Sequence, residues 1–318
     1  MRWWGGRESG NVEYGSGGGG GKLAVGGGIG TLIIAAIVYL LGGNPSQLLN
    51  QQQSGGSTET TTEKQGGYDS TDRFVKVVLA QTEDVWGPIF REAGREYRQP
   101  KLIQFEGSVQ SACGFAEAAT GPFYCPADER VYLDKSFFRE LKERFNAGGD
   151  FANAYVIAHE VGHHVQNLMG TSGKVEQIRR QEDRTTANRY SVMLELQADF
   201  YAGIWAHYVN KSGNVVENGD IESALNAANQ IGDDRMQMRS KGHVVPDAFT
   251  HGTSAQRMYW FKKGFETGDL KQGNTFQELA GLYYYHLDVQ RRLATLGVTC
   301  SDMTQPCPSG APGAPRNQ

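Results

Sequence analysis

The sequence lacks any long run of lysine or arginine, and its formal net charge over 318 residues is −4. Proteins that bind nucleic acid concentrate basic side chains on one face, because the phosphate backbone supplies much of the attraction. We therefore expect no nucleic-acid partner. Cysteine is also scarce, with four in the chain. Their spacing never gives the C-x-x-C pattern of a zinc ribbon, which argues against that kind of structural metal site.

Charge is absent from residues 23–43, a run dominated by apolar residues and glycine. A helix of this length extends about 30 Å, which matches the hydrocarbon core of a bilayer. Basic residues precede the run at Arg2, Arg7 and Lys22, and the next one follows at Lys64. This bias predicts a single-pass membrane anchor, with the N-terminus in the cytoplasm and the rest in the periplasm or elsewhere outside the cytoplasm. A cleaved signal peptide is the alternative, but no A-x-A-like cleavage site follows the run.

The cysteines form two local pairs, Cys113 with Cys125 and Cys300 with Cys307. An even number of cysteines in local pairs, on the outer side of a membrane, suggests two disulfides that each close a small loop. Four free thiols or a cysteine-rich metal site are the alternatives. We therefore expect the disulfides Cys113–Cys125 and Cys300–Cys307.

Composition divides the chain into segments. Residues 1–22 are rich in glycine and predict a disordered cytoplasmic tail before the anchor at 23–43. Residues 44–68 are rich in Gln, Ser, Thr and Gly, which predicts a flexible linker. Apolar periodicity begins near residue 69, so we expect one folded domain over residues 69–299. Residues 300–318 return to proline and glycine and predict a loose tail.

Within this domain the apolar residues repeat mostly at helical spacing, whereas residues 129–134 predict a short strand. Asp150 is expected to cap a central helix that ends at Gly170. Thr275 and Glu278 form a capping-box pattern before a last, aromatic-rich helix. The pattern predicts an α+β fold, mainly helical with a small sheet. Further helices are expected over residues 72–92, 136–146, 185–210 and 220–231.

The central helix carries the sequence HEVGH at residues 159–163. His159 and His163 are four residues apart, so they lie one above the other on one helix face and can bind one ion. Glu160 is rotated by about 100° from His159, which places it beside the ion, where it can take a proton from bound water. The pattern can arise by chance, but here it lies in an apolar helix. His164 points elsewhere, and we expect it behind the ligands or at the surface.

A catalytic zinc ion typically has three protein ligands and one open position. Glu195 is the candidate third ligand, because it interrupts an otherwise apolar helix face where an unpaired carboxylate would be costly. Asp199 lies one turn further along the same face. From there it can accept a hydrogen bond from the distal N–H of a zinc-bound histidine and fix the tautomer of that ring. A solvated Glu–Asp pair is the structural alternative.

This arrangement resembles the glutamate-type zincins, the gluzincins. Five segments together resemble the neutral zinc metallopeptidase family of bacterial membrane-anchored proteins, over most of residues 70–300. The resemblance implies a zincin-like catalytic domain in which His159, His163 and Glu195 bind one catalytic Zn²⁺. It also implies that Glu160 is the general base. The five segments are HEVGHH, GPFYCPADERVYLD, ELQAD, IGDDR and HGTSAQR.

The resemblance also bears on His251, which opens the last of these segments. In related zincins a histidine downstream of the third ligand donates a hydrogen bond to the oxyanion of the tetrahedral intermediate. Alternatively, His251 and Arg257 only brace the helix capped by Thr253 or Ser254 against the helix that carries Glu195. The acidic and basic side chains of Asp233–Arg235 are expected to form a buried ion pair that packs the domain, rather than a part of the catalytic machinery.

The residues and the resemblance together predict a membrane-anchored, zinc-dependent endopeptidase that acts on peptide or protein substrates. Water activated by the metal would attack a peptide carbonyl with Glu160 as base. An edge strand around residues 129–134 would align the extended substrate. A zinc-containing scaffold without turnover and a hydrolase of a non-peptide amide are the alternatives, and the presence of Glu160 favours catalysis. The metal is inferred, because two nitrogen ligands and one oxygen ligand also suit cobalt or manganese.

Overall fold

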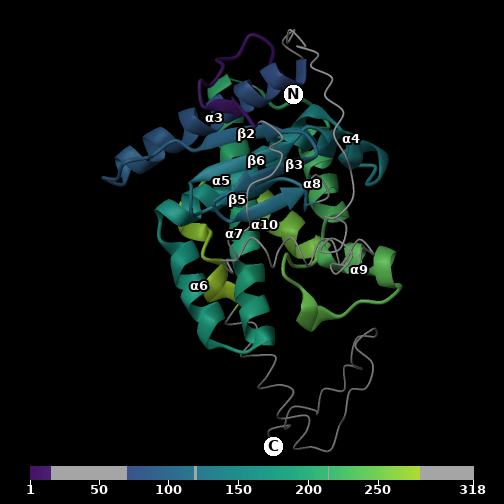
Figure 1. Ribbon diagram of the computed structural model, residues 1–318. Coiled ribbons are helices and arrows are strands. Elements are labelled where there is room, and N and C mark those ends of the chain that lie inside the picture. Colours follow the sequence, from purple (N-terminus) through teal and green to yellow (C-terminus); the bar gives the residue numbers. More distant parts are fainter. Residues whose placement is uncertain (16–69, 118–119, 214, 280–318) are drawn as a thin grey trace, which may run out of the picture. The chain divides into compact units, whose positions relative to one another are not determined.

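The structure is a computed structural model, and it describes residues 1–15, 70–117, 120–213 and 215–279 (Figure 1). The predicted anchor at 23–43 lies outside the described residues, as do the predicted linker and the predicted pair Cys300–Cys307. Among the helices that the structure does describe, none combines the length and the apolar character needed to cross a bilayer. Met1–Thr275 form one compact unit.

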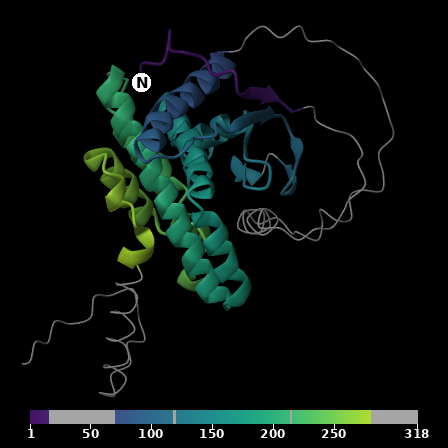
Figure 2. The ribbon, with the colours of Figure 1, turned by 90° about the vertical axis from the view of Figure 1, so that its left-hand side faces the viewer.

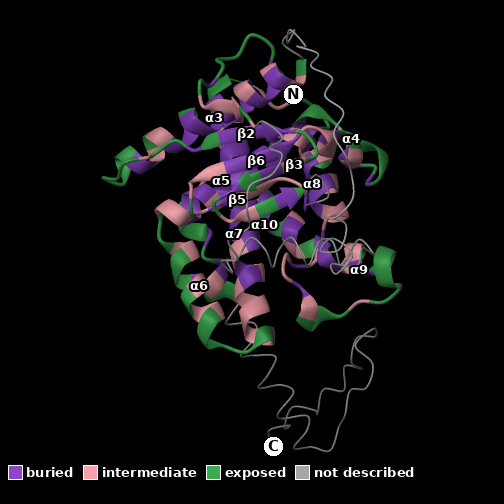
Figure 3. Ribbon diagram, in the orientation of Figure 1, coloured by how far each residue is buried: buried purple, intermediate pink, exposed green. Residues whose placement is uncertain are grey.

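A four-stranded sheet forms one layer of this unit, with the strand order β1-β2-β6-β5. Strands β1, β2 and β6 are parallel, and β5 is antiparallel to β6. Almost every residue of β2 and β6 is buried, which is typical of parallel strands covered on both faces (Figure 3). The strands are β1 (Val12–Tyr14), β2 (Lys101–Phe105), β5 (Phe123–Cys125) and β6 (Arg130–Asp134).

The strand predicted at 129–134 is confirmed as β6, but its expected position at the edge is wrong. Strand β6 pairs with β2 on one side and with β5 on the other, because each of these short segments has backbone groups that need partners. The edge beyond β6 is therefore formed by β5. A substrate that adds to the sheet at this end would pair with β5.

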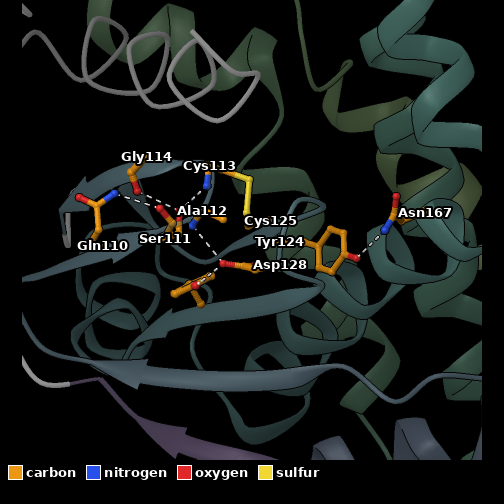
Figure 4. Close-up of a disulfide and its surroundings, with 10 residues drawn as sticks. Gln110, Ser111, Ala112, Cys113, Gly114, Tyr124, Cys125, Asp128 and Asn167 are labelled. Carbon is orange, nitrogen blue, oxygen red and sulfur yellow. Dashed lines mark hydrogen bonds between the residues drawn. A yellow bond between two sulfur atoms is a disulfide. The ribbon is translucent and has the colours of Figure 1, made fainter. Parts of the chain in front are cut away.

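A hairpin of β3 (Ser108–Ser111) and β4 (Gly114–Glu117) lies beside the edge strand β5 (Figure 4). A disulfide between Cys113, in the turn of the hairpin, and Cys125 of β5 joins the two. The predicted pair Cys113–Cys125 is thus confirmed. Val109 and Ala116 of the hairpin pack with Tyr132 of β6 in one apolar cluster, so the hairpin covers part of the sheet.

Helices form the rest of the unit, and their arrangement around the sheet can be followed in Figure 1. The central helix α5 packs against β5, β6, α3, α7 and α8. It begins at Asp150, with Gly149 rather than Asp150 in the capping position, and it is followed by Gly170 in the left-handed conformation. The helices are α3 (Ser70–Glu92), α4 (Ser136–Glu143), α5 (Asp150–Leu168), α6 (Thr171–Gln181), α7 (Arg184–Gly213), α8 (Asp220–Gln230), α9 (Asp233–Lys241) and α10 (Ser254–Thr267), with short 3-10 turns at Pro246–Ala248 and Leu270–Gln272.

The predicted helices at 72–92, 185–210 and 220–231 correspond to α3, α7 and α8, and the one at 136–146 is shorter. Helix α10 begins after Thr253, whose side chain accepts a hydrogen bond from the backbone of Gln256 in a capping box. Of the two candidate caps, Thr253 and Ser254, it is therefore Thr253 that caps α10.

Glycines let the helices of the core approach closely. A Cβ atom on Gly264 of α10 would lie 2.2 Å from the carbonyl oxygen of Phe200 on α7, and one on Gly203 would lie 2.1 Å from that of Phe261. Gly162 plays the same part between α5 and α7, because a Cβ there would lie 3.0 Å from the carbonyl oxygen of Ala198. The glycine inside HEVGH therefore allows α7 to lie close to the two histidines.

Residues Met1–Tyr14, here called the N-terminal segment, do not form the disordered tail expected from composition. The segment lies along α3 and ends in β1 (Figure 2). Trp3 is only 5% exposed and donates a hydrogen bond from Nε1 to Asp150 Oδ2 at 2.8 Å. Composition was misleading here because a few side chains and one strand, rather than overall apolar content, attach this segment to the domain.

Candidate metal centre

The two histidines of HEVGH lie on the face of α5 that meets α7. Their ring centroids are 4.8 Å apart. Glu195 of α7 lies opposite both rings, with Oε2 at 3.2 Å from His159 Nε2 and Oε1 at 3.4 Å from His163 Nε2. One donor atom from each of the three residues lies within 4.8 Å of the other two, so together they can hold a metal ion. The structure thus brings together the three predicted ligands from two helices, although Glu195 lies 32 residues beyond His163 in sequence.

The chemistry of these donors suits a catalytic metal. Both rings direct Nε2 towards Glu195, and both use Nδ1 for a hydrogen bond elsewhere. A histidine whose Nδ1 is occupied in this way presents the lone pair of Nε2 to an ion. Two imidazoles and one carboxylate, with a fourth position left to water or substrate, are typical ligands of catalytic zinc.

Asp199 fixes the orientation of His159. Its Oδ1 accepts a hydrogen bond from His159 Nδ1 at 2.8 Å and another from the hydroxyl of Tyr155 at 2.6 Å. Arg257 of α10 donates to the other side of the carboxylate, with Nε at 2.8 Å from Oδ2. Burial would raise the pKa of Asp199, but the charges of Arg257 and His159 lower it to about 2. Asp199 is therefore a carboxylate in a fully buried network.

His163 has a neutral partner instead. Gln166, one turn further along α5, accepts a hydrogen bond from His163 Nδ1 through Oε1 at 2.9 Å. The amide nitrogen of Gln166 donates to the carbonyl oxygen of Leu194 at 2.7 Å, beside the third ligand Glu195. Gln166 is wholly buried, and it links the second histidine to the backbone of α7. Sequence reasoning missed Gln166, although its spacing of three residues from His163 places it on the same helix face.

The protonation of the metal-free site follows from its charges. Burial would lower the pKa of His159, but the charge of Asp199 and the hydrogen bonds to Asp199 and Glu195 raise it to about 10. Burial would raise the pKa of Glu195, but the two histidines hold it well below the usual value. Without a metal, both ring nitrogens of His159 are therefore protonated at neutral pH, and the ring is positively charged. A metal that binds Nε2 has to displace the proton on that nitrogen.

Glu160 is 8% exposed and follows His159 directly in α5. Burial raises its pKa above the usual value of a glutamate, against the opposing influence of His159 and His163. Its carboxylate is not among the three groups that converge. A buried carboxyl with a raised pKa, next to a metal site, is suited to accept and return a proton.

His251 lies in the loop before α10, and Asp233 holds that loop in place. Asp233 Oδ2 accepts hydrogen bonds from the backbone amides of Thr250, His251 and Gly252, at 2.6 to 3.0 Å. The imidazole Nδ1 of His251 also lies 3.2 Å from Asp233 Oδ1. Burial lowers the pKa of His251, but the charges of Asp233 and Glu195 outweigh burial and raise it. Glu195 contributes to this rise, so His251 lies within electrostatic range of the candidate ligands.

The acidic pair at the start of α9 does pack the domain, but through other partners than an ion pair within Asp233–Arg235. Asp233 pairs with His251, as described above. Asp234 accepts hydrogen bonds from the backbone and side chain of Ser254, at 2.8 and 2.7 Å. Arg257 contacts Asp199 of α7 and Tyr155 of α5, in line with the alternative that it braces its helix against the ligand helix. It therefore braces α10 against the two helices that carry the candidate ligands.

His164 is completely buried and faces away from the candidate ligands, so of its two expected positions the one at the surface is wrong. Its Nε2 donates to the carbonyl oxygen of Arg98 at 2.6 Å, and its Nδ1 lies 3.0 Å from the hydroxyl of Tyr124 on β5. Asn167 of α5 donates to the same hydroxyl (Figure 4). Burial lowers the pKa of His164, which fits a neutral ring that ties α5 to the edge strand.

A model of the family described as "Putative neutral zinc metallopeptidase" matches residues 1–276. A protein of Escherichia coli K12, "Uncharacterized protein YpfJ", is 53% identical over 208 residues, which are 65% of this chain and 72% of that protein. A protein of Mycobacterium tuberculosis H37Rv, "Uncharacterized protein Rv2575", is 41% identical over 219 residues, which are 64% of this chain and 72% of that protein. No solved structure matches the chain.

Proposed function

The chain belongs to the neutral zinc metallopeptidase family, and from this premise we propose that it is a membrane-associated, zinc-dependent endopeptidase. The observation that carries the proposal is the convergence of His159, His163 and Glu195, with Glu160 beside them. The first three residues would hold Zn²⁺. When bound, the metal would supply a coordinated water with a pKa lowered towards about 7 and would polarise the carbonyl of the substrate.

The proton transfers fall to Glu160 in this proposal. Its carboxylate takes a proton from the attacking water and later delivers it to the nitrogen of the leaving amine. Burial supports this role, because it raises the pKa of Glu160 towards the range in which a group can both accept and donate a proton near neutral pH.

His251 stabilises the oxyanion of the tetrahedral intermediate in the same proposal. Asp233 supports this role by fixing the loop and by sharing a hydrogen bond with Nδ1, which leaves Nε2 to donate towards the substrate. The raised pKa of His251 favours the protonated ring, whose charge strengthens such a hydrogen bond. Aiming a fixed donor at a developing negative charge is commonly among the larger contributions to hydrolysis.

We assign the alignment of the substrate to β5. An extended peptide can add to the edge of a sheet through main-chain hydrogen bonds. Strand β5 ends the sheet nearest α5, and Tyr124 connects the strand to His164, the neighbour of the candidate ligand His163. The disulfide Cys113–Cys125 holds the same strand against the β3–β4 hairpin. The contact of Tyr124 with His164 and the disulfide therefore both help to fix the position of β5 relative to the candidate metal site.

We further propose that residues 23–43 hold the protein at a membrane and that the catalytic domain lies outside the cytoplasm. The uncharged run supports the first part. The disulfide Cys113–Cys125 supports the second part, since such bonds persist in oxidising compartments. A second disulfide, Cys300–Cys307, remains part of the proposal on the basis of its spacing.

The substitution Glu160→Gln tests the enzymatic part of the proposal. We expect the rate of cleavage of an unfolded protein or a peptide mixture to fall by about 10²- to 10⁴-fold, because the general base is lost. The zinc content of the purified protein should stay unchanged. The matched control is Glu182→Gln, at an exposed position at the end of α6, which should cleave like the unmodified protein.

Undiminished cleavage by Glu160→Gln would contradict the proposed mechanism. Zinc retention without cleavage by the unmodified protein would instead favour a zinc-containing scaffold. Turnover of a non-peptide amide, such as a cell-wall component, in a screen where peptides stay intact would redirect the proposal to another class of substrate.

A further inference from the structure

The N-terminal segment is paired with the catalytic domain along its whole length. In β1, Val12, Glu13 and Tyr14 pair in parallel with residues of β2. The backbone ladder extends beyond the strand, with Leu102 N donating to Asn11 O at 2.9 Å and Gly15 N donating to Gln104 O at 2.8 Å. At the other end of the segment, Arg2 N donates to the carbonyl oxygen of Val215. The sheet that positions the candidate site therefore includes residues that precede the apolar run.

A buried carboxylate depends on this segment. Glu83 lies in α3 and is only 4% exposed. Ser9 and Asn11 donate to its Oε1 at 2.5 and 2.8 Å, and Arg7 donates to its Oε2 at 2.8 Å. Removing the segment would take these donors from a buried charge, which is strongly unfavourable. The residues around Glu83 therefore form a binding surface, to which the N-terminal segment is bound.

The segment also reaches the helix that carries the candidate ligands. Trp3 donates to Asp150, the first residue of α5, and packs edge-on against Phe74 of α3 at 5.4 Å between ring centroids. Gly6 lies so close to α3 that a Cβ atom would be 2.8 Å from Val77 Cγ1. These contacts join the start of α5 to α3 through the N-terminal segment.

From these contacts we propose that the N-terminal segment stays in the catalytic domain of the membrane-bound protein, so that residues 14 and 70 lie on the same side of the membrane. A single crossing between these residues would separate β1 from β2 and Glu83 from its partners. The run at 23–43 would then attach the protein without a net crossing of the bilayer. This inference rests on the proposed membrane attachment, and it replaces the single-pass topology that the positive charges suggest.

The side follows from the disulfide. Cys125 lies in β5, two strands from β2, which pairs with β1. A sheet that carries a disulfide belongs in an oxidising compartment, so the N-terminal segment is expected there too. The charges of Arg2 and Arg7, which predict a cytoplasmic N-terminus, are both paired with carboxylates of the folded domain, and Arg2 pairs with Glu217. Arg7 is used within the domain, in its contacts with Glu83 and Asp84.

Labelling of two engineered cysteines tests the proposal in the full-length chain. Gly10→Cys probes the N-terminal segment at an exposed position with no atom within 4 Å of the new Cβ. Met238→Cys probes the catalytic domain at a side chain that is 53% exposed. Each is made with Cys300→Ser and Cys307→Ser, so that no other thiol reacts while Cys113 and Cys125 are bonded. Bacterial spheroplasts are treated with a membrane-impermeant maleimide, before and after permeabilisation, and the membrane fraction is analysed.

We expect both cysteines to be labelled to the same extent before permeabilisation, with less than a twofold increase afterwards. Labelling of one site before and of the other only after permeabilisation would overturn the proposal. If both sites require permeabilisation, the shared side is supported and the location outside the cytoplasm is refuted.

Release of the whole chain from the membrane fraction by a high-salt wash would overturn both the attachment and the inference drawn from it. The proposed peptidase activity is measured separately, through Glu160→Gln, and does not depend on any of these outcomes.

Discussion

At the scale of single residues, the site combines one charged and one neutral support for its two histidines. His159 is held by Asp199, which is itself neutralised by Arg257, whereas His163 is held by the amide of Gln166. A carboxylate makes its histidine a stronger donor to a metal than an amide does. Breaking the buried Asp199–Arg257 pair by removing either partner would leave an uncompensated charge, at a cost of about 3–5 kcal/mol.

The substitution Gln166→Met tests the support of His163. It leaves Nδ1 of His163 without its acceptor, so we expect zinc affinity to fall by about tenfold or more. Competition with a chelating dye measures the change. Gln181→Met, at the exposed end of α6, is the matched control and should bind zinc like the unmodified protein. Equal affinities of the two variants would show that Gln166 does not position the ring.

The stability of the metal-free protein should depend on pH through His159. Its pKa is raised from 6.5 to about 10 on folding, so the stabilisation is fully present below pH 6.5 and is lost as the pH rises towards 10. Urea unfolding with a chelator should therefore show a decrease in the free energy of unfolding across this range. With zinc present, the additional stabilisation by the metal should grow over the same range, because the competing proton leaves.

The variant His159→Gln should lose this particular dependence on pH, whereas His243→Gln, at an exposed position after α9, should retain it. A metal-free protein whose stability rises from pH 6.5 to 10 would contradict the assignment of a protonated His159.

The three candidate ligands could be predicted from sequence because helical periodicity relates nearby residues. His159 and His163 share a face by their spacing, and Glu195 stood out as a charge on an apolar face. The contact between Tyr155 and Arg257 could not be predicted, since they meet across 102 residues and the pairing depends on how three helices pack. The role of Gln166 also depends on packing, although its spacing was visible.

At the scale of elements, the contact between α7 and α10 decides where Arg257 and the loop of His251 lie. The two helices meet at Gly203 and Gly264, where their backbones lie so close together that no side chain fits at either position. Neighbouring backbone atoms cannot give way as a flexible side chain can. The crossing therefore sets the distance between α10 and the helix that carries Glu195.

The substitution Gly264→Ala should separate these helices. Its Cβ would meet the carbonyl oxygen of Phe200 at 2.2 Å, so we expect a loss of about 1–3 kcal/mol in the free energy of unfolding, or more if the helices cannot adjust. Cleavage should decline as well, because Arg257 moves with α10. Gly173→Ala in α6 meets no atom within 4 Å and should be neutral or stabilising. Similar effects from both substitutions would contradict the proposed role of the crossing.

Helices were easier to predict than strands in this chain. Helix α3 covers 23 residues and shows its period clearly, whereas β1 and β5 have three residues each. So short a strand has no alternation to recognise, and its partners lie far away in the sequence. Strand β6 could be predicted from its sequence. Its central position depends on pairing with β2 and β5, and these two strands were not predicted.

At the scale of the whole molecule, the compact unit that ends at Thr275 includes Met1–Tyr14 as well as the described residues from Ser70 onwards. Composition suggested a boundary near residue 69, because glycine-rich sequence surrounds the short segment that pairs with β2. The first fourteen residues contribute a strand, a buried tryptophan and the donors to Glu83. Such contributions depend on tertiary contacts and cannot be recognised by average composition.

A chain that begins at residue 69 should accordingly be less stable than one that includes the N-terminal segment. We expect it to unfold at a lower temperature, since Glu83 loses its donors, and to aggregate, since the edge of β2 is uncovered. Joining residues 1–15 to residue 70 through a Gly/Ser linker of about 20 residues should restore stability. Trp3→Ala should lower the melting temperature of the full chain, whereas Trp4→Ala, at a side chain that is 67% exposed, should change it little. An equally stable shortened chain would contradict this account.

The parallel pairing of β1 with β2 also has a consequence for the order of events during synthesis. Val12 leaves the ribosome 90 residues before its partner Leu102. At about 5–20 residues per second, this strand waits on the order of 5 to 20 s for the next strand of its sheet. The apolar run at 23–43 emerges during that interval. Any attachment of this run to a membrane would therefore begin before the domain exists, and the first strand stays unpaired until its partner arrives.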